Sequence, residues 1–337
     1  MTKQKLAVVL MNLGGPDAQE NVRPFLFNLF SDPAIIALPP PFRQLLAKFI
    51  SARREKKAQG IYDKLGGKSP LLENTQEQQR ALEMLLKDRL PHWDTRVFIA
   101  MRYWHPLSEE TATEVKAWGA DLVVTLPLYP QFSTTTTASS LKLWRQLSTN
   151  LKTIDQGCYF QDPGFIAAYQ DLLQQKRQEA PGNISLRVLF SAHGIPQKFV
   201  DQGDPYQWQV EKSVAAIMEN CQVDHRICYQ SRVGPLKWLG PSLEQEIEQA
   251  AKDQVGIIVV PIAFVSEHSE TLVELDIDFK NKALALGIPY YGRVATVGSH
   301  PEFIAGLARL VQARVDTQQS YQAGLCPPEF KHCGCRP

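Results

Sequence analysis

Residues 256–279 read GIIVVPIAFVSEHSETLVELDIDF, and this stretch decides the fold. The β-branched run Ile257–Val260 predicts a strand buried on both faces, as in the centre of a parallel sheet. Ser266 can cap a helix, with Ser269 and Glu270 in its first turn. Because ligands bind at the carboxyl ends of strands in open α/β sheets, this strand-to-helix connection predicts a site.

Acids recur every fourth residue of the predicted helix, at Glu270, Glu274 and Asp278. This spacing places three carboxylates in one row, and like charges so placed destabilise a helix. One interpretation is a solvated acidic face near a helix N-terminus, where the dipole favours acids. The other is a row of oxygen ligands for a divalent cation, with His268 as a nitrogen ligand or a base.

The composition limits the classes of function. The chain has 337 residues and a formal net charge of +1, so two domains of ordinary size are expected, without bulk attraction to nucleic acid. No apolar run reaches transmembrane length, and the first residues do not follow a signal-peptide pattern. We expect a cytoplasmic protein.

Apolar runs and helical segments alternate along the chain, which predicts an α/β fold with parallel sheets flanked by helices. The other apolar runs are 6–13, 96–101, 122–128 and 186–190. The helical segments are 75–90, 108–118, 165–178, 206–220 and 243–252. MNLGGP is echoed by SAHGIP, and LPLYPQFSTTTT by VPIAFVSEHSET. The echo suggests two similar α/β domains facing a cleft, although weak repetition is common among doubly wound proteins.

Residues 25–50 are rich in Phe and Leu, and Arg53 and Arg54 follow them. An apolar helix with a basic end is typical of ordinary core packing. The alternative is an apolar lip that contacts a membrane surface or a flat apolar ligand.

His193 follows an apolar run and precedes Gly-Ile-Pro, so it is expected at a strand end facing a cleft. Together with the acids of 256–279 it indicates proton abstraction beside a metal. The GGPD turn lacks the remaining parts of a dinucleotide fingerprint, and neither a Walker A motif nor a Gly-x-Ser-x-Gly elbow occurs.

Eight stretches carry a resemblance to a known family: LMNLGGP, SARREKKAQGIYDKLGGKSPL, RYWHPLSEE, LPLYPQFSTTTTASSL, LFSAHGIP, GDPY, YQSRVGPLKWLGP and PIAFVSEHSETLVELDIDF. In this order they resemble the ferrochelatases, which insert ferrous iron into protoporphyrin. The resemblance implies two Rossmann-like, chelatase-like domains at 1–160 and 161–316, with the active-site cleft between them, and a tail at 317–337.

The resemblance also assigns roles. His193 is similar to the family's active-site histidine, Glu270 to its paired carboxylate, and His268 to the histidine just before it. His193 and Glu270 would take the pyrrole protons and contact the metal, while Glu274 and Asp278 would relay metal or protons. In the family this acidic row lies on a helix with a π-type widening.

The expected porphyrin contacts are Leu13, Arg53, Arg54, Tyr62, Ser69, Arg102 and Tyr129. Arg side chains suit propionates because a guanidinium matches a carboxylate with two hydrogen bonds. A branch of the family that uses coproporphyrin carries Tyr at the position of Leu13, so Leu13 favours protoporphyrin IX.

Three cysteines crowd the end of the chain, at Cys326, Cys333 and Cys335. Thiolates so placed are typical of a metal or iron–sulfur site, although a disordered tail is the alternative. Many ferrochelatases carry a 2Fe–2S cluster on three tail cysteines and one cysteine of the body. The position of that body cysteine in the animal enzymes corresponds to Thr134, so Cys158 is the expected substitute.

The expected substrates are therefore protoporphyrin IX and ferrous iron, without nucleic acid. The alternatives are a coproporphyrin or other tetrapyrrole metal chelatase, and a porphyrin or haem carrier without catalysis. We also expect peripheral contact with the inner membrane through residues 25–50, and we consider a homodimer.

Overall fold

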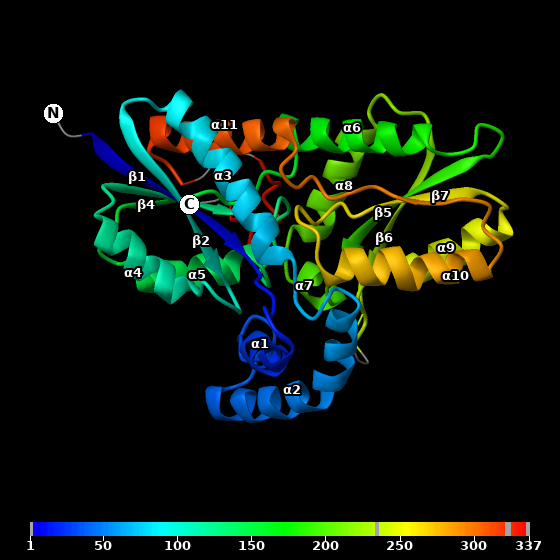
Figure 1. Ribbon diagram of the computed structural model, residues 1–337, viewed down its shortest axis with the longest axis horizontal. Coiled ribbons are helices and arrows are strands. Elements are labelled where there is room, and N and C mark those ends of the chain that lie inside the picture. Colours follow the sequence, from blue (N-terminus) through cyan, green and yellow to red (C-terminus); the bar gives the residue numbers. More distant parts are fainter. Residues whose placement is uncertain (1–2, 233–235, 321–324, 335–337) are drawn as a thin grey trace. The chain divides into compact units, whose positions relative to one another are not determined.

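The computed structural model describes residues 3–232, 236–320 and 325–334 (Figure 1). The chain divides into two compact units. The first comprises Met1–Cys158, Leu307–Pro327 and Cys333–Pro337, and the second comprises Tyr159–Gly306 and Pro328–His332.

The first unit contains a four-stranded parallel sheet in the order β2-β1-β3-β4. Its strands are β1 (Gln4–Asn12), β2 (Trp93–Met101), β3 (Leu122–Pro127) and β4 (Thr153–Asp155). Its helices are η1 (Gln19–Asn21), α1 (Val22–Phe30), α2 (Pro40–Asp63), α3 (Leu71–Arg89), α4 (Ser108–Trp118) and α5 (Thr137–Leu147). α11 (Pro301–Thr317) begins in the second unit and ends in the first.

Burial explains this sheet. β1 and β3 lie in the middle of it, and all their residues from Leu6 to Asn12 and from Leu122 to Pro127 are buried. Such continuous apolar runs suit parallel strands covered on both faces. Gly14 follows β1 with φ +87°, and a Cβ there would lie 2.9 Å from the Trp104 backbone nitrogen, so the turn requires glycine.

The second unit repeats this topology, with the parallel order β6-β5-β7-β8. Its strands are β5 (Leu186–His193), β6 (Asp224–Gln230), β7 (Gly256–Val260) and β8 (Tyr291–Arg293). Its helices are α6 (Pro163–Gln178), α7 (Gln197–Asp201), α8 (Tyr206–Met218), α9 (Leu243–Lys252), the π-helix η2 (Glu270–Phe279) and α10 (Lys280–Ala285). One buried cluster joins β7, α9 and η2 through Ile257, Ile247 and Leu275.

The predicted α/β class with two parallel sheets flanked by helices is thus confirmed. The apolar run after β7 continues to Phe264, but the strand ends at Val260 because Pro261 has no backbone N–H for the ladder. The predicted helix start differs from the observed one, since η2 begins at Glu270 and its N-cap residue is Ser269 in place of Ser266.

The predicted π-type widening is confirmed over the ten residues of η2. π-Helices are rare and occur mostly as single-turn bulges, frequently at functional sites. Among the described residues, no helix is both long and apolar enough to cross a membrane.

Candidate active site

His193 is the last residue of β5, and Glu270 is the first residue of η2, which follows the neighbouring strand β7. His193 Nδ1 lies 2.7 Å from Glu270 Oε2. Because a carboxylate accepts hydrogen bonds, Nδ1 carries the proton, and Nε2 is the nitrogen that can exchange protons with a ligand. The structure therefore brings these two predicted site residues together.

His193 and Glu270 shift each other's pKa. Burial lowers the pKa of His193, but the charge and hydrogen bond of Glu270 outweigh burial and raise it overall. Burial conversely raises the pKa of Glu270, and the charge of His193 outweighs it, so the net pKa of Glu270 is lowered. A carboxylate at a helix N-terminus is stabilised further by the helix dipole. Glu270 thus stays ionised and favours the charged form of His193.

His268 lies next to this pair in a different electrostatic state. Its Nδ1 lies 3.1 Å from the carbonyl oxygen of Ser266, which can only accept, so Nδ1 carries a proton and neutral His268 offers Nε2 as an acceptor. Burial lowers the pKa of His268, and the charge of His193 adds to this lowering. The Phe264 ring lies near both histidines, with its centroid 4.6 Å from that of His268 and 6.4 Å from that of His193.

Glu274 joins the pair through a residue that the sequence patterns did not single out. Ser231 Oγ lies 2.8 Å from Glu270 Oε2 and 2.6 Å from Glu274 Oε2. Burial and the charge of Glu270 raise the pKa of Glu274. Adjacent Gln230 is buried and donates to Glu274 Oε2 over 3.3 Å. Gln230 ends β6 and Ser231 follows it, and the mixed sequence DHRICYQ of this strand gives little strand signal.

The other acids at or near η2 have different surroundings from Glu270 and Glu274. Asp278, predicted as the next ligand, is exposed. Glu267 and Asp276 pair with Arg293 of β8, at 2.5 Å in both cases. These two acids thus serve to fix η2 against the sheet, a role that the spacing of the acids did not reveal.

Arg102, a predicted porphyrin contact of the first unit, is held by a buried acid. Its guanidinium lies 2.7 Å from Asp32, which is 3% exposed, and its Nε donates to Ser139 over 2.9 Å. Tyr103 also donates to Asp32, over 2.8 Å. The charge of Arg102 is therefore already balanced within the first unit.

The other predicted contacts of the first unit lie on different elements. Arg53 is exposed on α2, and Arg54 covers the Phe30 ring at 5.6 Å. Leu13 and Tyr62 share an apolar cluster with α1. Ser69 and Tyr129 complete the predicted set, Ser69 buried and Tyr129 half-buried, and burial raises the pKa of Tyr129.

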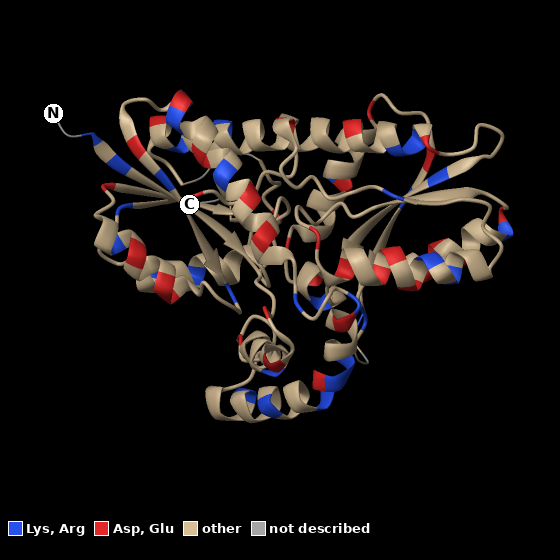
Figure 2. Ribbon diagram, in the orientation of Figure 1, with Lys and Arg blue, Asp and Glu red and all other residues tan. Residues whose placement is uncertain are grey.

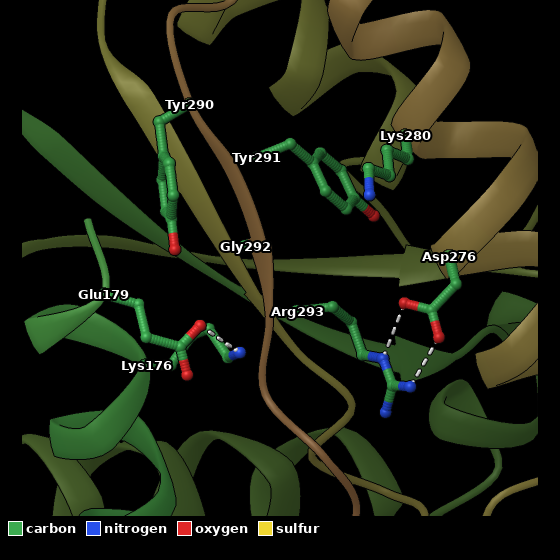
Figure 3. Close-up of a pocket in the computed structure, with 8 residues that line it drawn as sticks. All are labelled: Lys176, Glu179, Asp276, Lys280, Tyr290, Tyr291, Gly292 and Arg293. Carbon is green, nitrogen blue, oxygen red and sulfur yellow. Dashed lines mark hydrogen bonds and ion pairs between the residues drawn. The ribbon is translucent and has the colours of Figure 1, made fainter. Parts of the chain in front are cut away.

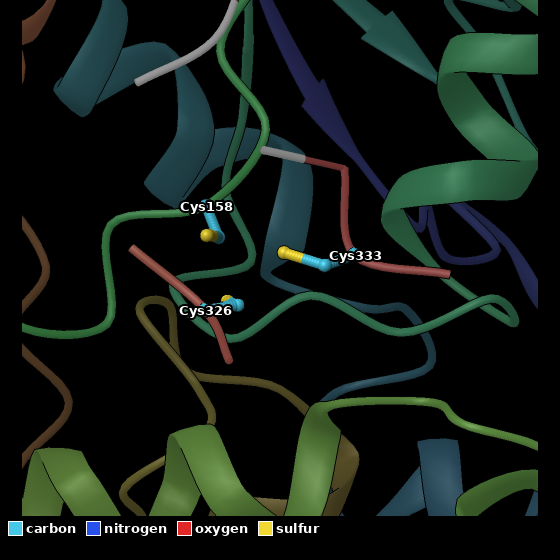
Figure 4. Close-up of side chains that lie close together, drawn as sticks. All are labelled: Cys158, Cys326 and Cys333. Carbon is cyan, nitrogen blue, oxygen red and sulfur yellow. The ribbon is translucent and has the colours of Figure 1, made fainter. Parts of the chain in front are cut away.

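Three of the predicted cluster ligands converge within the first unit (Figure 4). The sulfur atoms of Cys158, Cys326 and Cys333 lie within 4.8 Å of one another, and all three residues are buried. Cys335 lies outside the described residues. Three sulfurs in this arrangement match the donors that iron–sulfur clusters use.

The second unit also has a polar pocket of about 350 Å³, which Asp276 of η2 helps to line (Figure 3). Its walls include Asp276 and Arg293, which pair with each other, and Lys176 and Glu179, which pair at 2.6 Å. The pocket contains neither His193 nor Glu270, so we place no chemistry there.

Two α/β units of the same topology, with a His–carboxylate pair formed by the end of β5 and the start of η2 in the second, define a chelatase-like fold. Solved structures agree with this fold. The structure described as SirB from Bacillus subtilis with Fe3+ has a TM-score of 0.55 and 13% identity, and covers 94% of this chain and 98% of that chain. SirB from Bacillus subtilis subspecies spizizenii in complex with cobalt has a TM-score of 0.51 and 10% identity, and covers the same shares.

The chain belongs to the ferrochelatase family, whose model matches residues 5–315. A protein of Caulobacter vibrioides named ferrochelatase is 50% identical, over 99% of this chain and 98% of that protein. The ferrochelatase of Rickettsia felis is 45% identical over 99% of both chains. That of Wolbachia pipientis is 50% identical over 91% of this chain and 98% of its own length.

Proposed function

We propose that this protein inserts ferrous iron into protoporphyrin IX to form protohaem, the last step of haem synthesis. Its family membership makes it a metal chelatase, an enzyme of the lyase class. The observation that carries the proposal is the His193–Glu270 pair at the carboxyl end of β5, in a chain of this family.

The reaction removes two protons from the porphyrin nitrogens as Fe²⁺ enters, so the centre of the product is neutral. A base must accept these protons. His193 can accept one at Nε2 while its Nδ1–H donates to Glu270. The Glu270 carboxylate then stabilises the imidazolium. Glu274, and Asp278 further along η2, would relay metal or protons.

The direct test mixes the protein with protoporphyrin IX and Fe²⁺ without oxygen and follows the haem spectrum. We expect His193→Ala to abolish iron insertion while porphyrin fluorescence still reports binding. His92→Ala replaces an exposed histidine and serves as the matched control. Absence of haem formation by the native protein would refute the function, and normal turnover of His193→Ala would refute the role of His193.

We infer that the predicted contacts of the first unit hold the porphyrin, and that protoporphyrin is preferred over coproporphyrin. Arg53 and Arg54 are the cations best suited to propionates, because among the residues that the structure describes no buried acid pairs with either, whereas Asp32 pairs with Arg102. Substituting both by Ala should raise the KM for porphyrin with little change in kcat. Equal kcat/KM for coproporphyrin and protoporphyrin would contradict the preference.

We propose a 2Fe–2S cluster on Cys158, Cys326, Cys333 and Cys335. Such a cluster needs four thiolates, and three sulfurs already converge. When bound, it would supply a one-electron redox centre. Cys158 is buried and lies three residues after Asp155, which pairs with Arg145 at 2.6 Å. The purified protein should contain iron and labile sulfide, and Cys333→Ser should lose both while Cys221→Ser keeps them.

We further propose that α2 contacts the inner membrane from the cytoplasmic side. Phe42, Leu45 and Phe49 are 66%, 70% and 61% exposed. Basic residues follow on the same helix (Figure 2), which suits an anionic lipid surface. Phe49→Glu should abolish sedimentation with anionic vesicles. A second copy of the chain is the alternative occupant, and a dimer that Phe49→Glu dissociates, without vesicle binding, would favour it.

A further inference from the structure

Ser231 contacts both acids of the site with two different groups. Its hydroxyl lies 2.8 Å from Glu270 Oε2 and 2.6 Å from Glu274 Oε2, and its backbone N–H donates to Glu274 Oε1 over 3.1 Å. Both oxygens of Glu274 are therefore engaged by one residue. No pattern in the sequence assigned a role to Ser231.

The backbone of Ser231 is in an uncommon conformation. Its φ is +62°, in the left-handed region, which glycine adopts at lower cost than serine. Residues held in such conformations persist where the surroundings fix them, and they cluster at active sites and ligand clamps. The strain is thus located where the hydroxyl and the N–H can reach η2 together.

Neighbouring residues fix this conformation. Gly194 N–H donates to the carbonyl oxygen of Gln230 over 2.9 Å, and a Cβ on Gly194 would lie 2.8 Å from that oxygen. Gln230 Oε1 accepts from Ser191 over 2.7 Å, and its amide donates to the carbonyl oxygen of Glu270 over 3.2 Å. The turn after His193 and the turn that holds Ser231 are therefore packed directly against each other.

The hydrogen-bond count gives Ser231 a connecting role. A hydroxyl carries one proton, so it can donate to one of two carboxylate oxygens only. The second short oxygen–oxygen contact is a hydrogen bond only when the other carboxyl group carries a proton and donates to the hydroxyl. The geometry therefore connects His193, Glu270, Ser231 and Glu274 in one continuous series of short polar contacts.

We propose that Ser231 is a positioning residue for iron insertion, which holds the Glu274 carboxyl group against Glu270 and connects it with the His193–Glu270 pair. The inference rests on the proposed function. The titratable groups near Glu270 and Glu274 are His193 on β5, His268 before η2, and Tyr206 on α8. The Tyr206 hydroxyl donates to the His193 carbonyl oxygen over 3.0 Å.

Two variants separate the hydroxyl from the strained backbone. Ser231→Ala removes the hydroxyl and keeps Cβ, whereas Ser231→Gly removes the hydroxyl and relieves the strain at φ +62°. We expect both to lower kcat on the order of 10-fold to 100-fold, the range found when a supporting hydrogen-bond partner is removed, with the KM for porphyrin nearly unchanged. The acid side of the pH profile of kcat should also shift in both variants. Exposed Ser299→Ala is the matched control.

A second measurement requires no turnover. The free energies of unfolding of Ser231→Ala, Glu274→Gln and the double variant form a double-mutant cycle. If Ser231 holds Glu274, the two effects are not additive.

Results that refute the role of Ser231 differ from results that refute the proposed iron insertion. Native kcat and pH profile in both Ser231 variants, or an additive cycle, would overturn the inference while iron insertion by the native protein stands. A native protein without iron insertion would refute the function, and the cycle would still report whether Ser231 holds Glu274.

Discussion

Replacing Glu270 by Gln tests the charge of the pair separately from its shape. The amide oxygen of Gln can still accept the hydrogen bond from His193 Nδ1, which spans 2.7 Å in the native protein. What is lost is the negative charge that stabilises protonated His193. Any loss of rate therefore measures electrostatic stabilisation of the imidazolium formed when a pyrrole proton is accepted.

The size of this effect follows from distance and exposure. Two unit charges about 4 Å apart interact by about 1 kcal/mol in water and by about 4 kcal/mol at an effective dielectric constant near 20. The side chains of His193 and Glu270 are 41% and 26% exposed, so solvent screens them and the lower part of this range applies. An energy of about 1.4 kcal/mol corresponds to a roughly 10-fold lower kcat. His193→Ala should cost more, on the order of 10²-fold to 10⁴-fold, because it removes the acceptor itself.

The pH dependence has a defined sign. His193 must be neutral to accept a proton, so activity falls as the pH falls through its pKa. Glu270 raises the pKa of His193 above the ordinary value of 6.5. Glu270→Gln should therefore move the acid limb of the kcat/KM profile to lower pH. The assay is anaerobic haem formation from protoporphyrin and Fe²⁺ across this range.

Glu302→Gln, which changes an exposed acid at the start of α11, is the control for loss of one negative charge. An acid limb that stays in place or moves to higher pH would refute the reasoning. A loss of kcat in Glu270→Gln as large as in His193→Ala would also refute it, because charge stabilisation could not then be the main role of Glu270.

Two further predictions concern the supports of the site. Gly194→Ala places a Cβ 2.8 Å from the Gln230 carbonyl oxygen, so we expect about 1–3 kcal/mol of destabilisation by denaturant unfolding, together with lower kcat; native stability would contradict the close packing. Arg293→Gln leaves Glu267 and Asp276 without their cation, and should destabilise by about 3 kcal/mol, the low end for breaking a buried pair. Burial raises the pKa of Glu267, but the charge of Arg293 outweighs burial and lowers the pKa overall. The stability that ionised Glu267 contributes is therefore present above its ordinary pKa of 4.5, and it is lost as the pH falls through the pKa of the folded state. The native protein should lose stability in that acid range more steeply than Arg293→Gln, and parallel pH curves would contradict this account.

The sequence predicted the strands that are apolar throughout, because burial on both faces leaves a continuous signal. β1, β3, β5 and β7 all belong to this kind. β6 was missed because polar residues interrupt DHRICYQ, and half of it is not buried. The three-residue strands β4 and β8 are too short to produce a pattern.

The site residues likewise divide into those that follow a recognisable apolar strand and those that do not. His193 and Glu270 could be predicted because each follows an apolar strand, and the family resemblance paired them. Ser231 could not, because it follows a strand that was itself missed and acts through a backbone conformation that serine seldom adopts. Asp32 could not be predicted either, since its contact with Arg102 joins residues 70 positions apart in the sequence.

The acidic row of η2 is best understood through the unequal states of its first two members. His193 keeps Glu270 ionised, whereas burial and the charge of Glu270 favour the protonated form of Glu274. Ser231 and Gln230 also contact both oxygens of Glu274. Porphyrin releases two protons, and His193 and Glu274 are the imidazole and the carboxyl group of this site whose pKa is raised. We therefore expect Glu270 to serve as a fixed negative charge between His193 and Glu274, an arrangement that suits the passage of protons.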